Sequence, residues 1–242
     1  MKASADKIAV VFYGYPGSGK GTQADLLAKK IGLLHFDTGR YIERLVHNPA
    51  LRRDPVISRE RRFFDSGVLN TPAWVLSMVK RKVAEIAASG SGVVFSGSPR
   101  TLYEAFGDGK TGGLISLLEK KYGRKNLFIF SLNASEKSAM SRNSGRLICS
   151  VCGLQLLSVK SLACCINKTH CPFCGGPLIR RVFDNPEKMK VRIEQYLRRT
   201  RPIEKRLKEL GFKIIKINGE PSPYRVAVAT LKKIQPANAA SR

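Results

Sequence analysis

The stretch IAVVFYGYPGSGKGTQADLLAKKI, residues 8–31, decides the fold of this 242-residue chain. Residues 8–13 are apolar and rich in β-formers, which predicts a buried strand. A glycine-rich turn occupies residues 14–23. Apolar residues then recur at helical spacing over 24–31, and Gly32 stands where a C-terminal helix cap belongs. A strand, a glycine loop and a helix in this order form the context that a phosphate-binding loop requires.

The turn GYPGSGKGTQ has the composition of a loop that binds nucleotide phosphates. Gly14, Gly17 and Gly19 let the backbone curl so that its N–H groups point at one anion, and the helix N-terminus adds its positive dipole end. Lys20 can reach the β- and γ-phosphates of a nucleotide. An ordinary glycine turn is the competing interpretation, which both pattern and context oppose. The predicted ATP-binding residues of the loop are Gly17, Ser18, Gly19, Lys20, Gly21 and Thr22.

Further strands and helices alternate along the chain, which predicts an α/β fold: a P-loop three-layer sandwich with a mostly parallel sheet. Thr38 is expected to cap a short helix, whereas the arginine-rich residues 48–67 show little periodicity. Pro202 is expected to kink a long helix. The later strands are predicted at 93–95, 127–132 and 212–217, and the later helices from Pro72 to Gly90, at about 187–210 and at about 223–233.

Four of the six cysteines form two pairs with the spacing of a zinc site. Cys149-x2-Cys152 and Cys171-x2-Cys174 are separated by eighteen residues, and each pair can chelate a metal from a tight turn. Four thiolates form a closed tetrahedral site, so the predicted Zn2+ is structural and stabilises an insert too small to fold on its own core. Free thiols or disulfides are the alternative, which the paired spacing and a reducing compartment oppose.

Five segments, in order, resemble the adenylate kinase family over nearly the whole chain. The loop carries the family's Gly-Lys-Gly-Thr-Gln variant at 19–23. FDTGRYIER at 36–44 resembles the segment that helps to bind the acceptor monophosphate, and FSGSPRT at 95–101 resembles the family's Asp-Gly-Phe-Pro-Arg-Thr strand end. RNSGR at 142–146 and the run 181–192 resemble the two ends of the lid. Some members of the family have a zinc-bearing lid.

The resemblance implies a five-stranded parallel sheet with two mobile inserts, a monophosphate-binding arm and a four-cysteine zinc lid. The implied activity is reversible transfer of the terminal phosphoryl group of MgATP to a nucleoside monophosphate, with AMP the expected acceptor (ATP + AMP = 2 ADP). The implied cofactors are Mg2+ with ATP and structural Zn2+. The implied division of the chain is a core of 1–37, 90–144 and 185–242, an arm of 38–89 and a lid of 145–184.

Phosphoryl transfer asks a protein for positioning and charge neutralisation, and guanidinium groups suit phosphate oxygens and stay charged. By resemblance, one group of cations surrounds the transferred phosphoryl, and Arg44 and Arg100 hold the α-phosphate of the acceptor. The implied catalytic residues are Lys20, Arg142, Arg146, Arg181 and Arg192, of which Arg142 and Arg146 also bind ATP. The implied monophosphate-binding residues are Thr38, Arg44, Gly97, Arg100 and Glu104.

Several positions depart from the family's pattern. Arg40 and Ser96 stand where the family has acids that help to orient water around magnesium. Phe183 replaces one of two adjacent aspartates at the return from the lid, which leaves Asp184. Magnesium would therefore depend more on the phosphates, Thr22 and water, which is compatible with an ion that keeps several waters and takes few protein ligands.

Glu104 stands where the family has a glutamine that reads the acceptor adenine. An ionised carboxylate only accepts hydrogen bonds, and guanine presents two donors on its Watson–Crick edge, so a shift of acceptor towards GMP is one hypothesis. The other hypothesis, which we favour slightly, has Glu104 pointing to solvent while backbone groups read the base.

The charge of the chain leaves a second class of function open. Lys and Arg outnumber Asp and Glu by 43 to 18, a formal net charge of +25, and such a surface attracts polyanions. A degenerate kinase that binds RNA or a ribonucleoprotein is therefore the main alternative, although the intact phosphate loop and arginines oppose it. An ATP-dependent kinase of another small acceptor fits the loop but not the arm and lid.

The remaining expectations concern location and partners. Residues 1–7 lack the apolar run of a signal peptide, and no stretch approaches the roughly 18–20 apolar residues of a membrane span. We therefore expect a cytoplasmic monomer whose partners are ATP and a nucleoside monophosphate. Nucleic acid is a further possible partner on charge alone, and a membrane is not expected.

Overall fold

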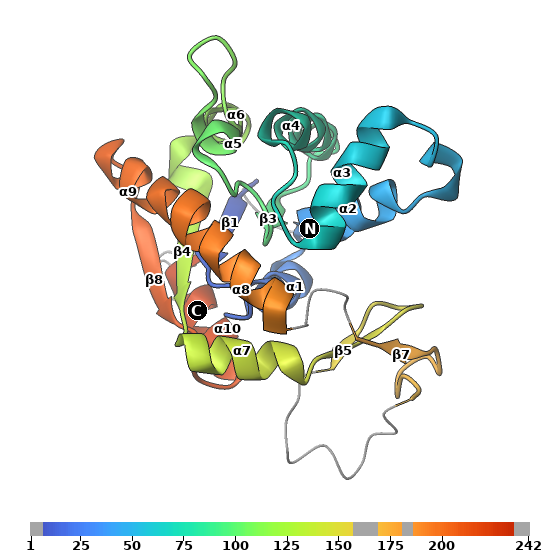
Figure 1. Ribbon diagram of the computed structural model, residues 1–242. Coiled ribbons are helices and arrows are strands. Elements are labelled where there is room, and N and C mark those ends of the chain that lie inside the picture. The colour runs from blue at the N-terminus through green and yellow to red at the C-terminus, as the bar shows by residue number, and fades with distance from the viewer. Residues whose placement is uncertain (1–6, 157–168, 181–185, 235–242) are drawn as a thin grey trace.

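The computed structural model describes residues 7–156, 169–180 and 186–234. At its centre is a parallel five-stranded sheet with the strand order β2-β3-β1-β4-β8 (Figure 1). The strands are β1 (Ala9–Gly14), β2 (Leu34–Phe36), β3 (Val93–Phe95), β4 (Leu127–Asn133) and β8 (Ile214–Asn218). β1 is central, and its Val11 lies opposite Phe95 of β3 and Ile129 of β4. The sheet confirms the predicted fold class.

Helices cover both faces of the sheet. The helices of the core are α1 (Lys20–Ile31), α5 (Leu102–Phe106), α6 (Leu114–Tyr122), α7 (Glu136–Ser144), α8 (Pro186–Gln195), α9 (Arg201–Glu209) and α10 (Pro223–Ile234). Side chains alternate across a strand, so Val10 and Phe12 of β1 pack with α1 and α10 on one face. Val11 and Tyr13 belong to the hydrophobic core on the other face, together with residues of α6 and α9. The result is the predicted three-layer arrangement.

An arm of helices projects from the core after β2. It consists of α2 (Thr38–Val46), the 3-10 turn η1 (Pro49–Leu51), α3 (Pro55–Ser66) and α4 (Pro72–Ala88), the last of which packs on the core. The expectation that Thr38 caps α2 is wrong by one residue. Asp37 is the N-cap, and its carboxylate accepts a hydrogen bond from the Arg40 N–H at 3.2 Å. Thr38 is instead the first helical residue, and it is buried.

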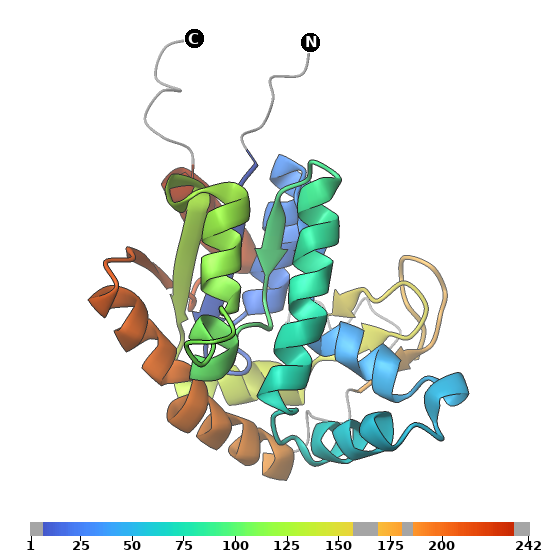
Figure 2. The same ribbon diagram turned by 90° about the horizontal axis from the view of Figure 1, so that it is seen from above.

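A small antiparallel sheet forms the described part of the lid. Its strand β5 (Leu147–Cys149) lies between β6 (Gln155–Leu156) and β7 (Leu178–Ile179). In Figures 1 and 2, the lid strands, yellow to orange, lie on the same side of the core as the blue-to-teal helices of the arm. The two inserts are therefore neighbours although they are far apart in the sequence.

The sequence pattern anticipated some elements and not others. The strands predicted at 8–13, 93–95, 127–132 and 212–217 correspond to β1, β3, β4 and β8. The pattern missed β2, a three-residue strand with no fully buried residue. It also missed α3, because arginines interrupt its apolar face. A local signal for α3 was present, since Asp54 caps the helix and Pro55 occupies its first position.

The long helix predicted at about 187–210 is interrupted. The π-helical segment η5 (Tyr196–Thr200) joins α8 to α9 just before Pro202. Proline has no backbone N–H and its ring opposes a straight α-helix, which explains the interruption that the sequence predicted as a kink. Thr200 Oγ1 donates to the Arg100 carbonyl at 2.8 Å. This hydrogen bond ties η5 to the loop that follows β3.

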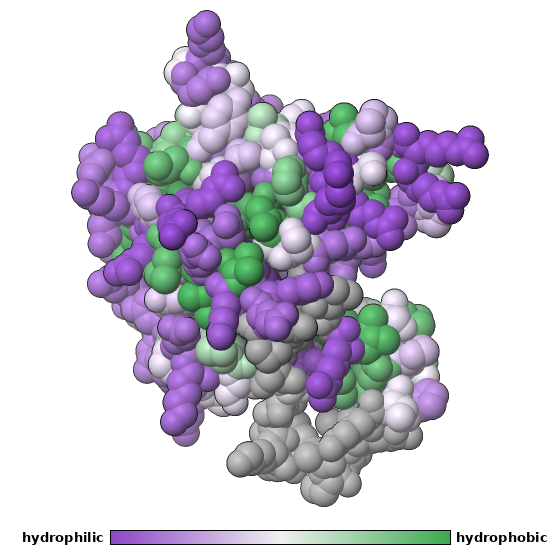
Figure 3. Space-filling view, viewed as in Figure 1, coloured by the Kyte–Doolittle hydropathy of each residue, from purple (hydrophilic) through white to green (hydrophobic). Residues whose placement is uncertain are grey.

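The outer end of the arm is strongly basic. Hydrophilic side chains cover it in Figure 3, and its exposed arginines are Arg52, Arg53, Arg59, Arg61 and Arg62.

Among the described residues, no helix has both the length and the apolar character that crossing a membrane requires.

Candidate active site

The phosphate loop lies between β1 and α1, as predicted. Gly14, Gly17 and Gly19 have φ angles of 141°, 90° and 97°, a region that favours glycine. A Cβ at Gly17 would lie 2.4 Å from the Ala139 carbonyl oxygen, so only glycine lets the loop pack this closely against α7. These glycines therefore set the curl of the loop at the N-terminus of α1, where the helix dipole favours an anion.

Lys20 lies at the centre of a cationic cluster. Its Nζ donates to the carbonyl oxygens of Gly14 and Tyr15, both at 2.7 Å. Burial and the positive charges of three arginines lower the pKa of Lys20 well below its ordinary value; the arginines are Arg100, Arg192 and Arg146. Cations that repel one another in this way favour the binding of a multiply charged anion, which relieves the repulsion.

A cavity of about 400 Å3 opens at the carboxyl ends of β1 and β3. Most of the phosphate loop lines it, and so do Ser96–Arg100 after β3 and Gly219–Pro223 before α10. Arg142, Arg146 and Arg192 complete its basic wall. In parallel α/β folds, ligands bind at this end of the strands. The cavity is large enough and basic enough to bind a nucleotide with several phosphates.

A second cavity, of about 90 Å3, lies between the core and the arm. Thr38 lines its arm side, and Gly97 and Glu104 line its core side. The residues that line both cavities are Asp37, Gly67, Leu69, Gly97, Ser98, Arg100 and Arg192. Two ligands bound in the two cavities would therefore meet at Arg100 and Arg192.

Several buried polar atoms around the cavities have no hydrogen-bond partner among the described residues. They include Ser18 Oγ, Thr38 Oγ1, Ser98 Oγ and Gln195 Oε1. Buried polar groups are nearly always hydrogen-bonded in folded proteins. Each of these side chains lines one or both cavities, so a polar ligand bound there would satisfy them.

Arg142 reaches towards the segment before α10. Its guanidinium donates to the carbonyl oxygens of Gly219 at 2.8 Å and Glu220 at 2.9 Å, and it lies 3.7 Å from a Glu220 carboxylate oxygen. The planar guanidinium is thereby fixed in the wall of the larger cavity beside the segment 219–220. This placement suits a group that packs on a nucleotide base.

The two cavities bring together most of the residues that the sequence singled out. These are Gly17, Ser18, Gly19, Lys20, Gly21, Thr22, Thr38, Gly97, Arg100, Glu104, Arg142, Arg146 and Arg192. Arg44 differs, because it is exposed and lines neither cavity. Glu43, one residue earlier in α2, lines the smaller cavity instead. Arg181 lies outside the described residues.

Glu104 is buried, with 3% of its surface exposed, so the expectation that it points to solvent is wrong. Its carboxylate accepts hydrogen bonds from the Arg100 N–H and the Thr101 hydroxyl, both at 3.0 Å. The Thr101 hydroxyl in turn accepts from the Glu104 N–H, which caps α5. Burial raises the pKa of Glu104, although these hydrogen bonds oppose the rise. The carboxyl group is therefore part of the wall of the smaller cavity and is held by its own helix.

Arg40 connects the arm to the lid. Its Nη2 donates to the Gly153 carbonyl at 2.9 Å, directly after Cys152. The side chain that stands in place of an acid is thus bound to the lid, and it lines neither cavity. No sequence pattern predicts this contact, because the two residues are 113 positions apart.

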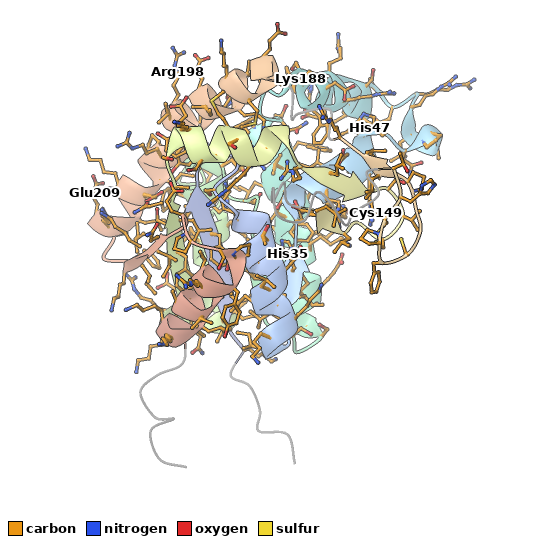
Figure 4. All side chains as sticks on the ribbon, turned by 90° about the horizontal axis from the view of Figure 1, so that it is seen from below. His35, His47, Cys149, Lys188, Arg198 and Glu209 are labelled. Atoms are coloured by element: carbon orange, nitrogen blue, oxygen red, sulfur yellow. The ribbon has the colours of Figure 1, made fainter. Side chains whose placement is uncertain are left out.

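Ser96 belongs to a hydrogen-bonded relay that the sequence did not reveal. Ser96 Oγ lies 2.8 Å from His35 Nε2, and His35 Nδ1 lies 2.6 Å from an Asp25 carboxylate oxygen. His35 lies beside α1 (Figure 4), on the edge strand β2. Asp25 belongs to α1, His35 to β2, and Ser96 directly follows β3, the strand that pairs with β2. The relay holds the Ser96 hydroxyl at the edge of the larger cavity.

Other cavity residues were also missed. Gln155 of the lid lines the larger cavity, as do Gln195, Tyr196 and Glu220. These positions carry no local motif. They reach the cavity only because the lid, η5 and the loop before α10 fold back over the carboxyl end of the sheet.

The four predicted zinc ligands form one cluster. All four Sγ atoms of Cys149, Cys152, Cys171 and Cys174 lie within 4.8 Å of one another. The sulfur atoms of Cys149 and Cys174 are 3.4 Å apart, and those of Cys152 and Cys171 are 3.7 Å apart. Tetrahedral zinc with Zn–S bonds of about 2.3 Å places its sulfurs about 3.8 Å apart. The cluster therefore has the dimensions of a four-thiolate metal site.

The electrostatics of the cluster also favour a cation. Burial opposes ionisation of Cys149, but hydrogen bonds from the N–H groups of Cys152 and Val151 outweigh it and lower the pKa of Cys149 to about 6. The Leu154 N–H favours the Cys152 thiolate, yet burial and the neighbouring thiols raise the pKa of Cys152 to about 12. Thiolates this close together oppose one another's ionisation, and a bound cation would stabilise them.

Comparison with known proteins agrees with the geometry. A family model described as adenylate kinase matches residues 12–211. The chain is 31% identical over 210 residues to an adenylate kinase from Chlamydia pneumoniae, covering 87% of this chain and 89% of that one. It is 28% identical over 214 residues to an adenylate kinase from Caldicellulosiruptor saccharolyticus, with 87% and 92% covered. It is 27% identical over 219 residues to one from Bacillus cytotoxicus, with 90% and 94% covered.

Proposed function

The chain belongs to the adenylate kinase family of nucleoside-monophosphate kinases, and from this premise we propose that it transfers the terminal phosphoryl group of MgATP reversibly to AMP. The observation that carries the proposal is the pair of cavities that share Arg100 and Arg192. Direct transfer requires the donor and acceptor phosphates to be held together in one basic site. The shared wall meets this requirement.

The larger cavity is the proposed ATP site. Gly17 to Thr22 present backbone N–H groups to the phosphates, and Lys20 neutralises charge at the transferred group. Arg146 and Arg192 act with Lys20 on the phosphates, since their charges already act on the pKa of Lys20. Arg142, held by Gly219 and Glu220, contacts the base. Arg181 keeps its proposed catalytic role by resemblance alone.

The smaller cavity is the proposed AMP site. Arg100 reaches both cavities, and its Nε donates to the Gly97 carbonyl at 2.7 Å. We propose that its Nη groups bind the α-phosphate of the acceptor in addition. The unpaired Thr38 hydroxyl is a second donor. Glu104 contacts the acceptor base, where its carboxylate accepts the adenine amino group. AMP, rather than GMP, is the proposed acceptor, in keeping with the adenylate kinases that the chain resembles.

The residues present also fit the two metals. Mg2+ bound with ATP would supply charge neutralisation at the phosphates, and Thr22, which lines the larger cavity, would offer it a hydroxyl ligand. The four-cysteine cluster would hold Zn2+ as a structural ion. We also propose that the protein is a cytoplasmic monomer and that its domains are the core, arm and lid given above.

The test is an assay of diphosphate formation by the zinc-loaded chain with ATP, Mg2+ and each of AMP, GMP, CMP and UMP. Turnover with AMP that Lys20→Ala abolishes would support the proposal, and the variant also controls for contaminating kinases. Turnover with GMP but not AMP would overturn the choice of acceptor. A folded chain with no turnover, combined with steeply salt-dependent binding to RNA, would favour the degenerate RNA-binding alternative instead.

A further inference from the structure

The larger cavity contains few acids for its positive charge. Among the described residues that line it, the carboxylates are those of Asp37 and Glu220. Glu220 lies at the proposed base end, where its carboxylate accepts from the Ser135 N–H at 2.6 Å and lies 3.7 Å from Arg142. Asp37 lies at the other end, at the start of the arm. It is therefore the acid, among those described, that faces the phosphate region.

The two positions that carry acids in the family supply no carboxylate in this chain. Arg40 is a base, and its guanidinium is bound to the Gly153 carbonyl of the lid. Ser96 is a neutral hydroxyl held at 2.8 Å from His35 Nε2. A reaction that needs acids to orient the waters of magnesium must find a carboxylate elsewhere in the site.

The geometry of Asp37 suits this task. It lies directly before α2 and lines both cavities, between the proposed donor and acceptor. One carboxylate oxygen accepts the Arg40 N–H at 3.2 Å, which fixes the side chain against the first turn of α2. A Cβ at Gly39 would be in ordinary van der Waals contact with the same oxygen, at 3.4 Å, so glycine at this position leaves that side of the carboxylate uncovered. A held carboxylate with space beside it can accept a hydrogen bond from a metal-bound water.

The charge of Asp37 also acts on the catalytic lysine. Of the charges near Lys20, that of Asp37 raises the lysine's pKa, against the lowering by the arginines. Such an influence falls off with distance and with solvent screening. Asp37 is therefore electrostatically coupled to the group that binds the β- and γ-phosphates, which is where magnesium accompanies ATP.

We propose that Asp37 is the positioning residue for the magnesium ion of ATP: its carboxylate accepts hydrogen bonds from waters on Mg2+ and takes over the role of the acids absent at positions 40 and 96. In this arrangement the carboxylate has moved from the first turn of α2 to its N-cap. The inference rests on the proposed binding of MgATP in the larger cavity. It adds a specific group that determines how the metal is held.

A purely structural role for Asp37 makes a different prediction. If the side chain only caps α2, asparagine and serine replace it at little cost, because all three residues are good N-caps. If it also positions the metal, Asp37→Asn keeps the helix but loses the negative charge. Asp54→Asn is the matched control, since Asp54 caps α3 of the same arm, accepts from Val56 and Ile57, and lines neither cavity.

The experiment measures metal binding directly. Mn2+ is titrated into the zinc-loaded chain with ATP and followed by electron paramagnetic resonance, and ATP binding without divalent metal is measured by calorimetry. We expect Asp37→Asn to weaken Mn2+ binding by about 10-fold or more, as for other outer ligands of metals, and Asp54→Asn to leave it unchanged. Metal-free ATP should bind Asp37→Asn at least as tightly as the unaltered chain, because a repulsion of the phosphates is removed.

Three results would overturn the inference. The first is an unchanged Mn2+ affinity in Asp37→Asn. The second is a loss of affinity confined to Asp184→Asn, which would place the positioning acid at the return from the lid. The third is no ATP binding by the unaltered chain, which would refute the proposed function as well, whereas the first two leave that function standing. If Asp37→Asn does not fold, Asp37→Ser repeats the test with a different capping side chain.

Discussion

Removing the Arg40 side chain should loosen the lid and the arm together. The contact between Arg40 Nη2 and the Gly153 carbonyl is a direct hydrogen bond between the two inserts, at 2.9 Å. It ends beside Cys152, so it joins α2 to the part of the lid that contains the cysteine cluster. Arg40→Ala breaks this bond, and we expect the closed arrangement of arm and lid to be less populated as a result.

The expected shift towards the open arrangement follows from the loss of one hydrogen bond, which the charged Arg40 guanidinium donates at a partly buried position. A hydrogen bond to a charged group contributes about 1.5–3 kcal/mol when well shielded, and partial exposure reduces this to about 1 kcal/mol. At 1.36 kcal/mol for a factor of ten, the open arrangement becomes about fivefold more populated. An effect of this size is measurable, and it is too small to unfold the chain.

Hydrogen exchange followed by mass spectrometry measures the opening directly. We expect amides of Ile148–Gln155 and of α2 to exchange about fivefold faster in Arg40→Ala, while the sheet of the core is unaffected. Arg44→Ala is the control, because it removes the same charge from the same helix at an exposed position that lines neither cavity. Equal exchange in the two variants would show that the contact does not hold the inserts together and would refute the reasoning.

Three further outcomes are expected. Cys152→Ser should release the bound zinc and remove the protection of β5 and β7 amides from hydrogen exchange. The control Cys164→Ser, at a cysteine outside the predicted ligands, should retain one zinc per chain. Metal analysis measures the zinc content, and hydrogen exchange measures the protection. Glu60→Gln should destabilise the arm by about 3 kcal/mol at neutral pH, because Thr71, Asn70 and Arg59 donate to this buried carboxylate. Although burial alone raises the pKa of Glu60, these hydrogen bonds hold it below its ordinary value. The stabilisation by the Glu60 carboxylate is therefore present above its ordinary pKa and is lost as pH falls through the lowered pKa. In thermal melts, the melting temperatures of Glu60→Gln and of the unaltered chain should therefore approach each other in acid. ATP binding should be accompanied by proton uptake at alkaline pH, because the phosphates raise the lowered pKa of Lys20. The affinity for ATP should therefore fall as pH rises through the pKa that Lys20 has in the complex. Calorimetry in two buffers of different ionisation enthalpy measures the proton uptake, and an equal uptake by Lys20→Met would contradict the assignment to Lys20.

The local parts of the site could be predicted because their signals are short-range. The phosphate loop is a run of glycines between a strand and a helix, and positive φ angles at Gly14, Gly17 and Gly19 follow from that composition. Two residues separate the cysteines within each pair, so each pair forms half of a site by itself. The burial of β1 and β4 follows from their apolar composition.

Other features had weaker signals or misleading ones. Glu104 is expected at the surface from its residue type alone, yet its own capping hydrogen bonds hold it in a buried wall. Arg44 resembles an acceptor-binding arginine in sequence, but the turn of α2 carries Glu43 to the cavity and Arg44 to solvent. One position along a helix rotates a side chain by about 100°, so neighbouring residues of α2 face different surroundings.

The sequence by itself determined the class of fold, the glycine loop after β1, the family and the two cysteine pairs, since each depends on residues close together or in a fixed order. Only the tertiary structure decided which side chains meet. Asp37 lines both cavities, Arg40 binds the lid, and Asp25, His35 and Ser96 join across α1, β2 and β3. The physical reason is that these contacts connect residues far apart in the chain, and their distances are set by how the core, arm and lid pack, which no local pattern of residues encodes.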